Sequence, residues 1–165
     1  MKEKQTDLTS EQLLAINVLA QSDLKDKFYW SGGTLLSHVY LHHRKSVDID
    51  FFSDEHFGLE KLVVWADNFC NVAKFSEYEE RRIHDRNEFI FKKKDYSLRV
   101  EFVYYNHTKK PINRNREKYE GVYIDSLEDI AANKFFAFFD RSEPKDLLDL
   151  YFLINLAERG YRHLN

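Results

Sequence analysis

The segment from Trp30 to Phe52 reads WSGGTLLSHVYLHHRKSVDIDFF and predicts a strand, a glycine turn, a helix and a second strand in that order. The apolar run 28–30 favours a short strand, which the pair Gly32-Gly33 interrupts. Residues 34–43, TLLSHVYLHH, favour a helix. Acidic and apolar side chains alternate over 47–52, as in a half-buried strand. This strand–turn–helix–strand unit therefore predicts the centre of a mixed α/β fold.

The glycine turn predicts a place where the backbone meets a phosphate. Glycine lets the chain approach such a group closely, and the start of a helix offers free N–H groups. Ser31 or Thr34 would add a hydroxyl donor. The alternative is a tight strand–helix turn that binds nothing, because Gly32-Gly33 alone is a weak signal.

Asp48 and Asp50 lie two residues apart on the predicted strand, so their side chains share one face, while Ile49 faces a core. Two neighbouring carboxylates repel each other, and a divalent cation such as Mg²⁺ relieves that repulsion. Glu101, in another predicted strand, is the best third carboxylate, since a buried one needs a partner. The alternatives are a solvent-facing acidic edge for the two aspartates and an ion-paired glutamate for Glu101.

The C-terminal part predicts two helices, over 126–140 and 144–158. Lys134 and Arg141 share one face of the first and would present positive charge to a triphosphate. A solvated outer face is the alternative. Asp146 and Asp149, on the second helix, would orient these cations or face water. We expect the aromatic residues of 135–139 and 151–152 to pack both helices onto the sheet.

The other segments complete a small mixed sheet flanked by helices. Further helices are expected at 8–24, capped by Thr9, and at 58–70. Further strands are expected at 72–78, 88–92, 98–105 and 122–124, with a hairpin turn at 93–95 and a long loop at 106–118. Residues 1–165 then form a single domain, with 126–165 as a candidate helical subdomain.

Composition narrows the class of protein. The chain has 165 residues, 43% of them hydrophobic, and a formal net charge of −3. The only cysteine, Cys70, excludes an intramolecular disulfide and is expected to be a small core residue. The polar first residues do not resemble a signal peptide, and the longest apolar runs fall short of a membrane span, so we expect a cytoplasmic protein.

Several basic and histidine residues have open roles. The loop 106–118 carries five cations, Lys109, Lys110, Arg114, Arg116 and Lys118, which would hold nucleic-acid phosphates or remain solvated. His38, His42 and His43 have a spacing that can bind zinc, but a surface cluster is the favoured interpretation. Arg44 would contact a phosphate or fix the start of the following strand.

The motifs together resemble a known family. Gly-Gly-Thr followed by Arg44-x-Ser46-x-Asp48-x-Asp50-Phe51-Phe52 resembles the nucleotidyltransferases of the AbiEii toxin group, in the DNA polymerase β-like superfamily. The stretch SLEDIAANK, ending at Lys134, resembles the segment that leads to the family's motif lysine. Arg141 and the stretch KDLLDLYFL at 145–153 agree as well. The resemblance covers about residues 28–156, and the chain looks like a minimal form of the family.

The resemblance implies a nucleotidyltransferase fold and a complete set of site residues. Two Mg²⁺ ions, or Mn²⁺, would bind Asp48, Asp50 and Glu101, with Lys134 as the remaining catalytic residue. The NTP phosphates would contact Ser31, Gly32, Gly33, Thr34, Arg44, Lys134 and Arg141, supported from behind by Ser46, Asp146 and Asp149.

The implied reaction is transfer of a nucleoside monophosphate from an NTP to an acceptor hydroxyl. The acceptor would be RNA, such as tRNA, or a protein, and the chain would be a toxin of a toxin–antitoxin or phage-defence system with a cognate antitoxin. The alternatives are a nucleotidyltransferase that modifies a small molecule such as an antibiotic, a non-catalytic module that binds NTP or a partner, and a plain α/β domain.

Overall fold

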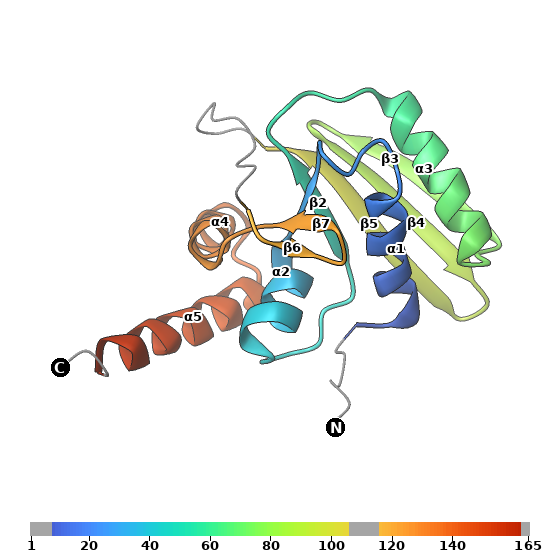
Figure 1. Cartoon of the computed structure of the whole chain (residues 1–165). Coiled ribbons are helices and arrows are strands. Elements are labelled where there is room, and N and C mark those ends of the chain that lie inside the picture. Colours follow the sequence, from blue (N-terminus) through green and yellow to red (C-terminus); the bar gives the residue numbers. More distant parts are fainter. Residues whose placement is uncertain (1–7, 106–115, 163–165) are drawn as a thin grey trace, which may run out of the picture.

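The computed structural model describes residues 8–105 and 116–162 of the chain. A mixed sheet is surrounded by helices (Figure 1), as the sequence predicts. The helical segments are α1 (Ser10–Ala20), α2 (Gly32–Leu35), the π-helical segment η1 (Leu36–Leu41), α3 (Leu59–Val72), α4 (Leu127–Arg141) and α5 (Pro144–Arg162). The strands are β1 (Tyr29–Ser31), β2 (Ile49–Ser53), β3 (Glu77–Ile83), β4 (Arg86–Lys93), β5 (Tyr96–Tyr104), β6 (Lys118–Tyr119) and β7 (Val122–Ile124).

The seven strands form one sheet in the order β3-β4-β5-β2-β1-β7-β6. β2 lies between β5, to which it runs parallel, and β1, to which it runs antiparallel. β1 in turn pairs in parallel with β7. The predicted strand–turn–helix–strand unit therefore occupies the middle of the sheet, where both of its strands have neighbours on each side.

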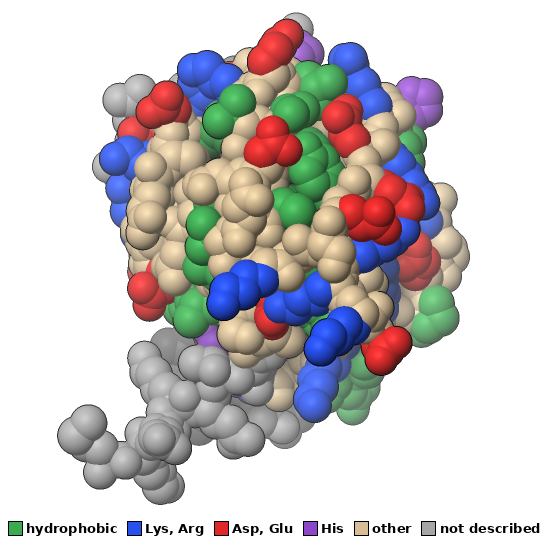
Figure 2. Space-filling view, turned by 90° about the vertical axis from the view of Figure 1, so that its right-hand side faces the viewer, with side chains coloured by type: hydrophobic (Ala, Val, Ile, Leu, Met, Phe, Trp, Pro, Cys, Tyr) green, Lys and Arg blue, Asp and Glu red, His purple; other side chains and the backbone are tan. Residues whose placement is uncertain are grey.

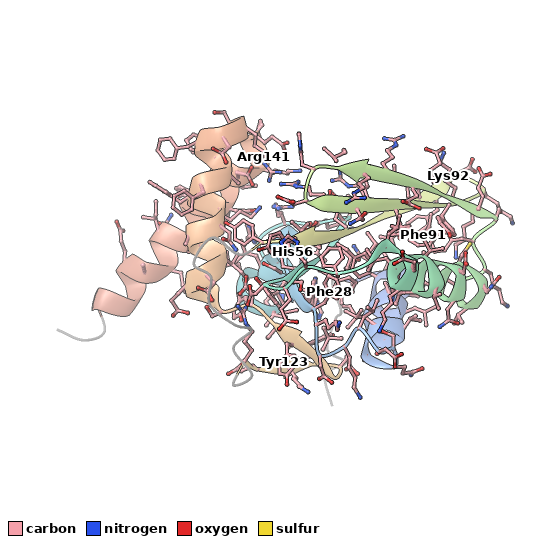
Figure 3. The ribbon with its side chains drawn as sticks, turned by 90° about the horizontal axis from the view of Figure 1, so that it is seen from above. Phe28, His56, Phe91, Lys92, Tyr123 and Arg141 are labelled. Atoms are coloured by element: carbon pink, nitrogen blue, oxygen red, sulfur yellow. The ribbon has the colours of Figure 1, made fainter. Side chains whose placement is uncertain are left out.

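The core lies between α1, α3 and one face of the sheet. Phe51 on β2, Phe91 on β4 and Phe102 on β5 are fully buried. Trp65 of α3 packs edge-on against all three rings. Figure 3 shows Phe91 in this layer, between the strands and α3. Because side chains alternate along a strand, Asp50 of β2 and Glu101 of β5 are left for the opposite face.

The helix expected at 34–43 begins two residues earlier, at Gly32, and changes character within itself. Residues 32–35 are α-helical, and residues 36–41 form a π-helix. His42 then closes the segment in the left-handed conformation, with φ 50°. A π-helical turn of this kind is rare and often occurs at functional sites.

The strand expected at 72–78 is wrong. α3 continues to Val72, and β3 runs from Glu77 to Ile83, joined to β4 by a turn at His84-Asp85. β3 is the edge strand of the sheet, and nearly all of its residues are exposed. Its sequence EYEERRI therefore lacks the apolar alternation of a half-buried strand, and its charges protect an open edge from unwanted pairing.

The expectation that aromatic residues pack α4 and α5 onto the sheet is wrong for most of these rings, although Phe152 packs on His43. Phe135, Phe136, Phe139 and Tyr151 are 52–67% exposed, and Phe135 contacts both Phe136 and Phe139 on α4. The buried positions of these helices are instead taken largely by charged residues, which are Lys134, Asp146 and Asp149. Ion pairs between the buried faces have displaced the rings to the outside.

Other expectations concern the surface. Figure 2 shows acidic and basic side chains intermixed on the face of the molecule that lies on the α3 side. Most of the basic loop, residues 106–115, lies outside the described residues, and so do Lys109, Lys110 and Arg114. Cys70 is half-buried and packs against the core. Within the described ranges, every helix is too short or too polar to cross a membrane.

Candidate functional site

The register of the sheet places the predicted carboxylates side by side. β2 and β5 are parallel neighbours, and Asp50 lies directly opposite Glu101. On the other side of β2, Asp50 lies opposite Ser31, the last residue before the glycine turn. Asp48 lies just before β2, which begins at Ile49, and its carboxylate reaches the same site because it contacts Arg99 of β5. The sheet thereby brings together the glycine turn, the Asp48-x-Asp50 pair and Glu101.

The two glycines of the turn make room for this arrangement. Gly32 has φ +79°, a conformation that favours glycine, and a Cβ atom there would lie 2.8 Å from Cγ of Asp50. A Cβ atom on Gly33 would lie 2.6 Å from Nη2 of Arg44 and 3.3 Å from Oγ of Ser46. A side chain at either position would therefore displace Asp50 or Arg44. The absence of side chains at Gly32 and Gly33 therefore leaves the space that Asp50 and Arg44 occupy.

The hydroxyls of the turn are already engaged. Ser31 Oγ donates to Asp125 Oδ2 at 2.8 Å, and Thr34 Oγ1 donates to the carbonyl of Asp48 and lies 2.8 Å from Ser46 Oγ. Both residues are buried. Their hydroxyls thus hold the turn against β7 and against the chain that leads into β2, which leaves the backbone N–H groups of the turn as the donors for a ligand.

Burial and neighbouring carboxylates both act on the charge state of Asp50. Burial, followed by the charges of Glu101 and Asp48, raises the pKa of Asp50 to about 7, although Lys134 and Arg99 oppose this rise. Like charges held close together favour the protonated form of one of them. An additional cation next to Asp50 would restore the charged form, and a neutral-range pKa also suits a group that exchanges protons.

Arg99 is a site residue that sequence reasoning missed. It lies on β5 two residues before Glu101, and its Nη2 atom bonds Oδ2 of Asp48 at 2.5 Å. Its Nη1 atom lies 3.3 Å from Oε1 of Glu88, on β4, and 3.4 Å from Oε1 of Glu101. The strand register could have indicated this, since an Arg-x-Glu pair on a strand presents both side chains to one face.

The carboxylates are not yet arranged as a metal centre. Across residues 8–105 and 116–162, no group of three or more Asp, Glu, His or Cys side chains is placed to hold a metal ion. The reason at this site is visible in the contacts, because Asp48 is turned toward Arg99 and Glu101 is shared with Arg99 and Arg86.

The predicted cations form a buried network behind the site. Lys134 Nζ lies 2.9 Å from Oδ1 of Asp146 and 2.8 Å from Oδ2 of Asp149. Arg141 forms a two-point contact with Asp146, and Arg44 forms one with Asp149. Figure 3 shows Arg141 between α4 and the strands. The expectation that Asp146 orients Lys134 and Arg141 agrees with these contacts, and Arg44 anchors α5 to the start of β2.

These contacts set the charge states of the two aspartates. Burial raises the pKa of Asp149, but hydrogen bonding from Arg44 and the charge of Lys134 outweigh it and hold the pKa at about 2. For Asp146, burial is likewise outweighed by Arg141 and Lys134, and its pKa is lowered. Both aspartates are therefore ionised at neutral pH, and Lys134 is held between two negative charges close to Asp50.

The expectation of a surface histidine cluster is wrong for His43. Its side chain is fully buried, and Nε2 lies 2.6 Å from Oδ1 of Asp149. The ring also packs on Phe152, with 5.0 Å between ring centroids. His38 contacts the hydroxyl of Tyr119 at 2.9 Å, and only His42 is exposed. The adjacent Arg44 binds the same aspartate, so the His43-Arg44 pair was the sequence signal for this contact.

Asp125 is a further residue of this region that the sequence analysis did not identify. Asp125, directly after β7, is 1% exposed and accepts hydrogen bonds from Ser31 and Arg116. The Arg116 guanidinium stacks on the ring of Tyr29, 3.9 Å from the ring centroid. Arg116 is therefore a structural residue and not one of the free cations expected in the loop.

Comparison with solved structures defines the class of fold. A candidate nucleotidyltransferase from Helicobacter pylori matches with a TM-score of 0.61 and 21% identity, over 88% of this chain and 69% of that one. The H. pylori protein JHP933 matches with a TM-score of 0.62 and 21% identity, over 88% and 67% of the two chains. The sheet and its helices therefore have a nucleotidyltransferase fold.

The sequence comparison goes one step further. Residues 12–163 match the family of the nucleotidyl transferase AbiEii toxin of type IV toxin–antitoxin systems, so the chain belongs to this family. Nearly the whole chain is matched, which includes the glycine turn, both strands that carry the carboxylates, and the two C-terminal helices. Curated protein sequences give no match.

Proposed function

We propose that this chain is a metal-dependent nucleotidyltransferase that moves a nucleoside monophosphate from an NTP to an acceptor hydroxyl and releases pyrophosphate. The observation that carries the proposal is the pairing of Asp50 with Glu101 beside the Gly32 turn, in reach of the charge of Lys134. Membership of a nucleotidyltransferase toxin family supports the same reaction.

The side chains present fit a divalent cation by their chemistry. Asp48, Asp50 and Glu101 supply hard oxygen ligands of the kind that Mg²⁺ or Mn²⁺ prefers. Burial and then the charges of Glu101 and Asp48 raise the pKa of Asp50, and a bound cation would favour its ionised form. Mg²⁺ held there, as two ions in the full site, would act as a Lewis acid on the triphosphate and lower the pKa of the acceptor hydroxyl.

The chain's own groups would then position the substrates. The N–H groups of Gly33 and Thr34, at the start of the helical segment, lack partners within the helix and would hold the phosphates. Lys134, fixed by Asp146 and Asp149, would neutralise charge that develops on the leaving pyrophosphate. Asp50 or Glu101 would accept the proton of the acceptor hydroxyl.

Membership of the family supports a toxin with a cognate antitoxin as partner. The acceptor that we propose is RNA, such as tRNA, or a protein. Modification of a small molecule uses the same site and differs only in the acceptor. A non-catalytic module that binds NTP or a partner is favoured by one observation, the ion pair that holds Asp48 on Arg99.

The test is incubation with each labelled NTP, Mg²⁺, and total tRNA or cell lysate. We expect a labelled product and pyrophosphate with the wild type, and loss of both with Asp50→Asn and Asp48→Ala. Label on RNA, on protein or on a small molecule identifies the acceptor class. If calorimetry detects bound NTP while no product forms with any of the four NTPs, the chain is a binding module and the catalytic proposal fails.

A further inference from the structure

Arg99 occupies the position that a cation would take among the acidic side chains. Its guanidinium contacts carboxylates from three segments of the chain, namely Asp48 before β2, Glu88 on β4 and Glu101 on β5. The closest contact is to Asp48, and Arg99 itself is 36% exposed. One fixed positive charge thus joins two of the three carboxylates that the proposed function assigns to a metal.

The geometry of these contacts means that Arg99 and a metal ion would compete for the same carboxylate oxygens. Nη2 engages Oδ2 of Asp48, and Nη1 engages Oε1 of Glu101. Charge-assisted bonds of this kind are directional, so they fix where each carboxylate points. A divalent cation that binds Asp48 and Glu101 at those oxygens must displace the guanidinium and must also overcome its repulsion at close range.

The rest of the network does not compete in the same way. Lys134 is held between Asp146 and Asp149, and Arg44 is held by Asp149, so these cations are fixed on carboxylates other than the proposed ligands. Arg86 contacts Glu101 at 3.5 Å from an exposed position. Arg81 lies on the same sheet face as Arg99 but contacts only Glu79 and Glu88. Among the described cations, Arg99 alone bonds Asp48.

We propose that Arg99 is a positioning residue that holds Asp48 out of metal coordination and is displaced when the divalent cation binds. This inference rests on the proposed function, because it takes Asp48 and Glu101 to be ligands. It explains why the carboxylates lie in one place without already forming a metal centre. When the divalent cation binds, it therefore replaces the Arg99 guanidinium on Asp48, an exchange of one cation for another.

The test measures metal affinity directly, without turnover. Mn²⁺ binding to the full chain is followed by the electron paramagnetic resonance signal of the free ion, at fixed pH and ionic strength. We expect Arg99→Met to lower the Kd for Mn²⁺ by about tenfold or more, the equivalent of about 1.4 kcal/mol. Arg99→Lys, which keeps the charge and loses the two-point contact, should fall between this variant and the wild type.

Two controls separate the exchange from a general effect of charge. Arg81→Met removes the same charge from the same sheet face and should change the Kd for Mn²⁺ by less than about twofold. Asp48→Asn combined with Arg99→Met should abolish the gain, since the freed ligand is then missing. Circular dichroism of each variant shows that the fold is kept.

The outcomes distinguish the inference from the proposed function. If the wild type binds Mn²⁺ and Arg99→Met binds it equally or more weakly, the exchange is wrong while the metal site stands. The exchange is also wrong if Arg81→Met gives the same gain. If neither the wild type nor Arg99→Met binds Mn²⁺, both the exchange and the metal-dependent function are wrong.

Discussion

Gly32 shows how one missing side chain shapes the site. Its φ of +79° is strained for other residues, and Asp50 fills the space where a Cβ atom would lie. A Gly-Gly pair in a sequence predicts only that the backbone bends or approaches something closely. The structure identifies the neighbour as a carboxylate of the protein itself, so position 32 controls Asp50 directly.

Gly32→Ala should therefore reduce both stability and function. The backbone conformation alone costs about 1–2 kcal/mol for a residue with a side chain, and the contact with Asp50 adds to this cost. Urea unfolding gives the stability, and nucleotide transfer gives the function. Gly121→Ala is the matched control, since φ there is +85° and an added Cβ would approach only the Cβ of Ala20, at 3.4 Å. It should lose stability but keep transfer, and equal loss of transfer by both variants would contradict this explanation.

Asp149 is the residue on which the buried cations depend, because it contacts Arg44, Lys134 and His43. Asp149→Asn removes the negative charge and should lower the free energy of unfolding by about 3–5 kcal/mol at pH 7. Glu143→Gln, in the exposed pair with Lys145, should change it by less than about 1 kcal/mol. Urea unfolding of the three proteins measures both values.

The same aspartate makes a prediction about pH. The pKa of Asp149 is about 2 in the folded chain, below its ordinary value of 3.8. A lowered pKa contributes stability that is present above about pH 4 and is lost as the pH falls toward 2. The stability difference between the wild type and Asp149→Asn should therefore narrow between pH 4 and pH 2. A difference that stays constant over this range would show that folding does not lower the pKa of Asp149.

Among the elements, α4 and α5 depart most from ordinary amphipathic helices. Their buried positions hold Lys134, Asp146 and Asp149, while Phe136 and Phe139 are exposed. Periodicity locates such helices correctly but assigns the apolar stripe to the core by default. Here the charged residues have partners on the neighbouring helix and in the loop before β2, and burial follows the availability of those partners.

The start of α4 depends on its cap. Ser126 Oγ accepts a hydrogen bond from the N–H of Asp129 at 3.1 Å, so Ser126→Ala should cost about 1 kcal/mol of stability. Ser126→Asp keeps an acceptor and places negative charge at the helix start, and it should restore most of that loss. Thermal unfolding of both variants checks the prediction, and equal destabilisation by the two would argue against a capping role.

At the scale of the whole molecule, ligand binding should be visible as a change in stability. A ligand at about 100 times its Kd adds about 2.7 kcal/mol to the folded state. For a domain of this size, Mg²⁺ with the preferred NTP should raise the Tm by about 5–10 °C. Differential scanning fluorimetry measures the shift, and a chelator should remove it. The shift should be absent in Asp50→Asn, and its persistence there would place the nucleotide elsewhere.

The sequence by itself determined the fold class, the family and the main motifs. Gly32-Gly33, Asp48-x-Asp50 and the helix that carries Lys134 are each encoded within a few neighbouring residues, where strand and helix periodicities apply directly. The helical segments α2 and η1, which follow the turn, are also local. These features could be predicted because spacing along a chain determines which side chains share a face.

Only the tertiary structure decided which charges meet. Arg99 and Asp48 are 51 residues apart, and His43 and Asp149 are 106 apart, so no local pattern relates them. The exposed rings of α4 and α5 and the charged edge strand β3 were mispredicted for the same reason. Burial of a charged residue depends on whether partners from distant segments reach it, and this is settled when the strands take their order and the helices pack.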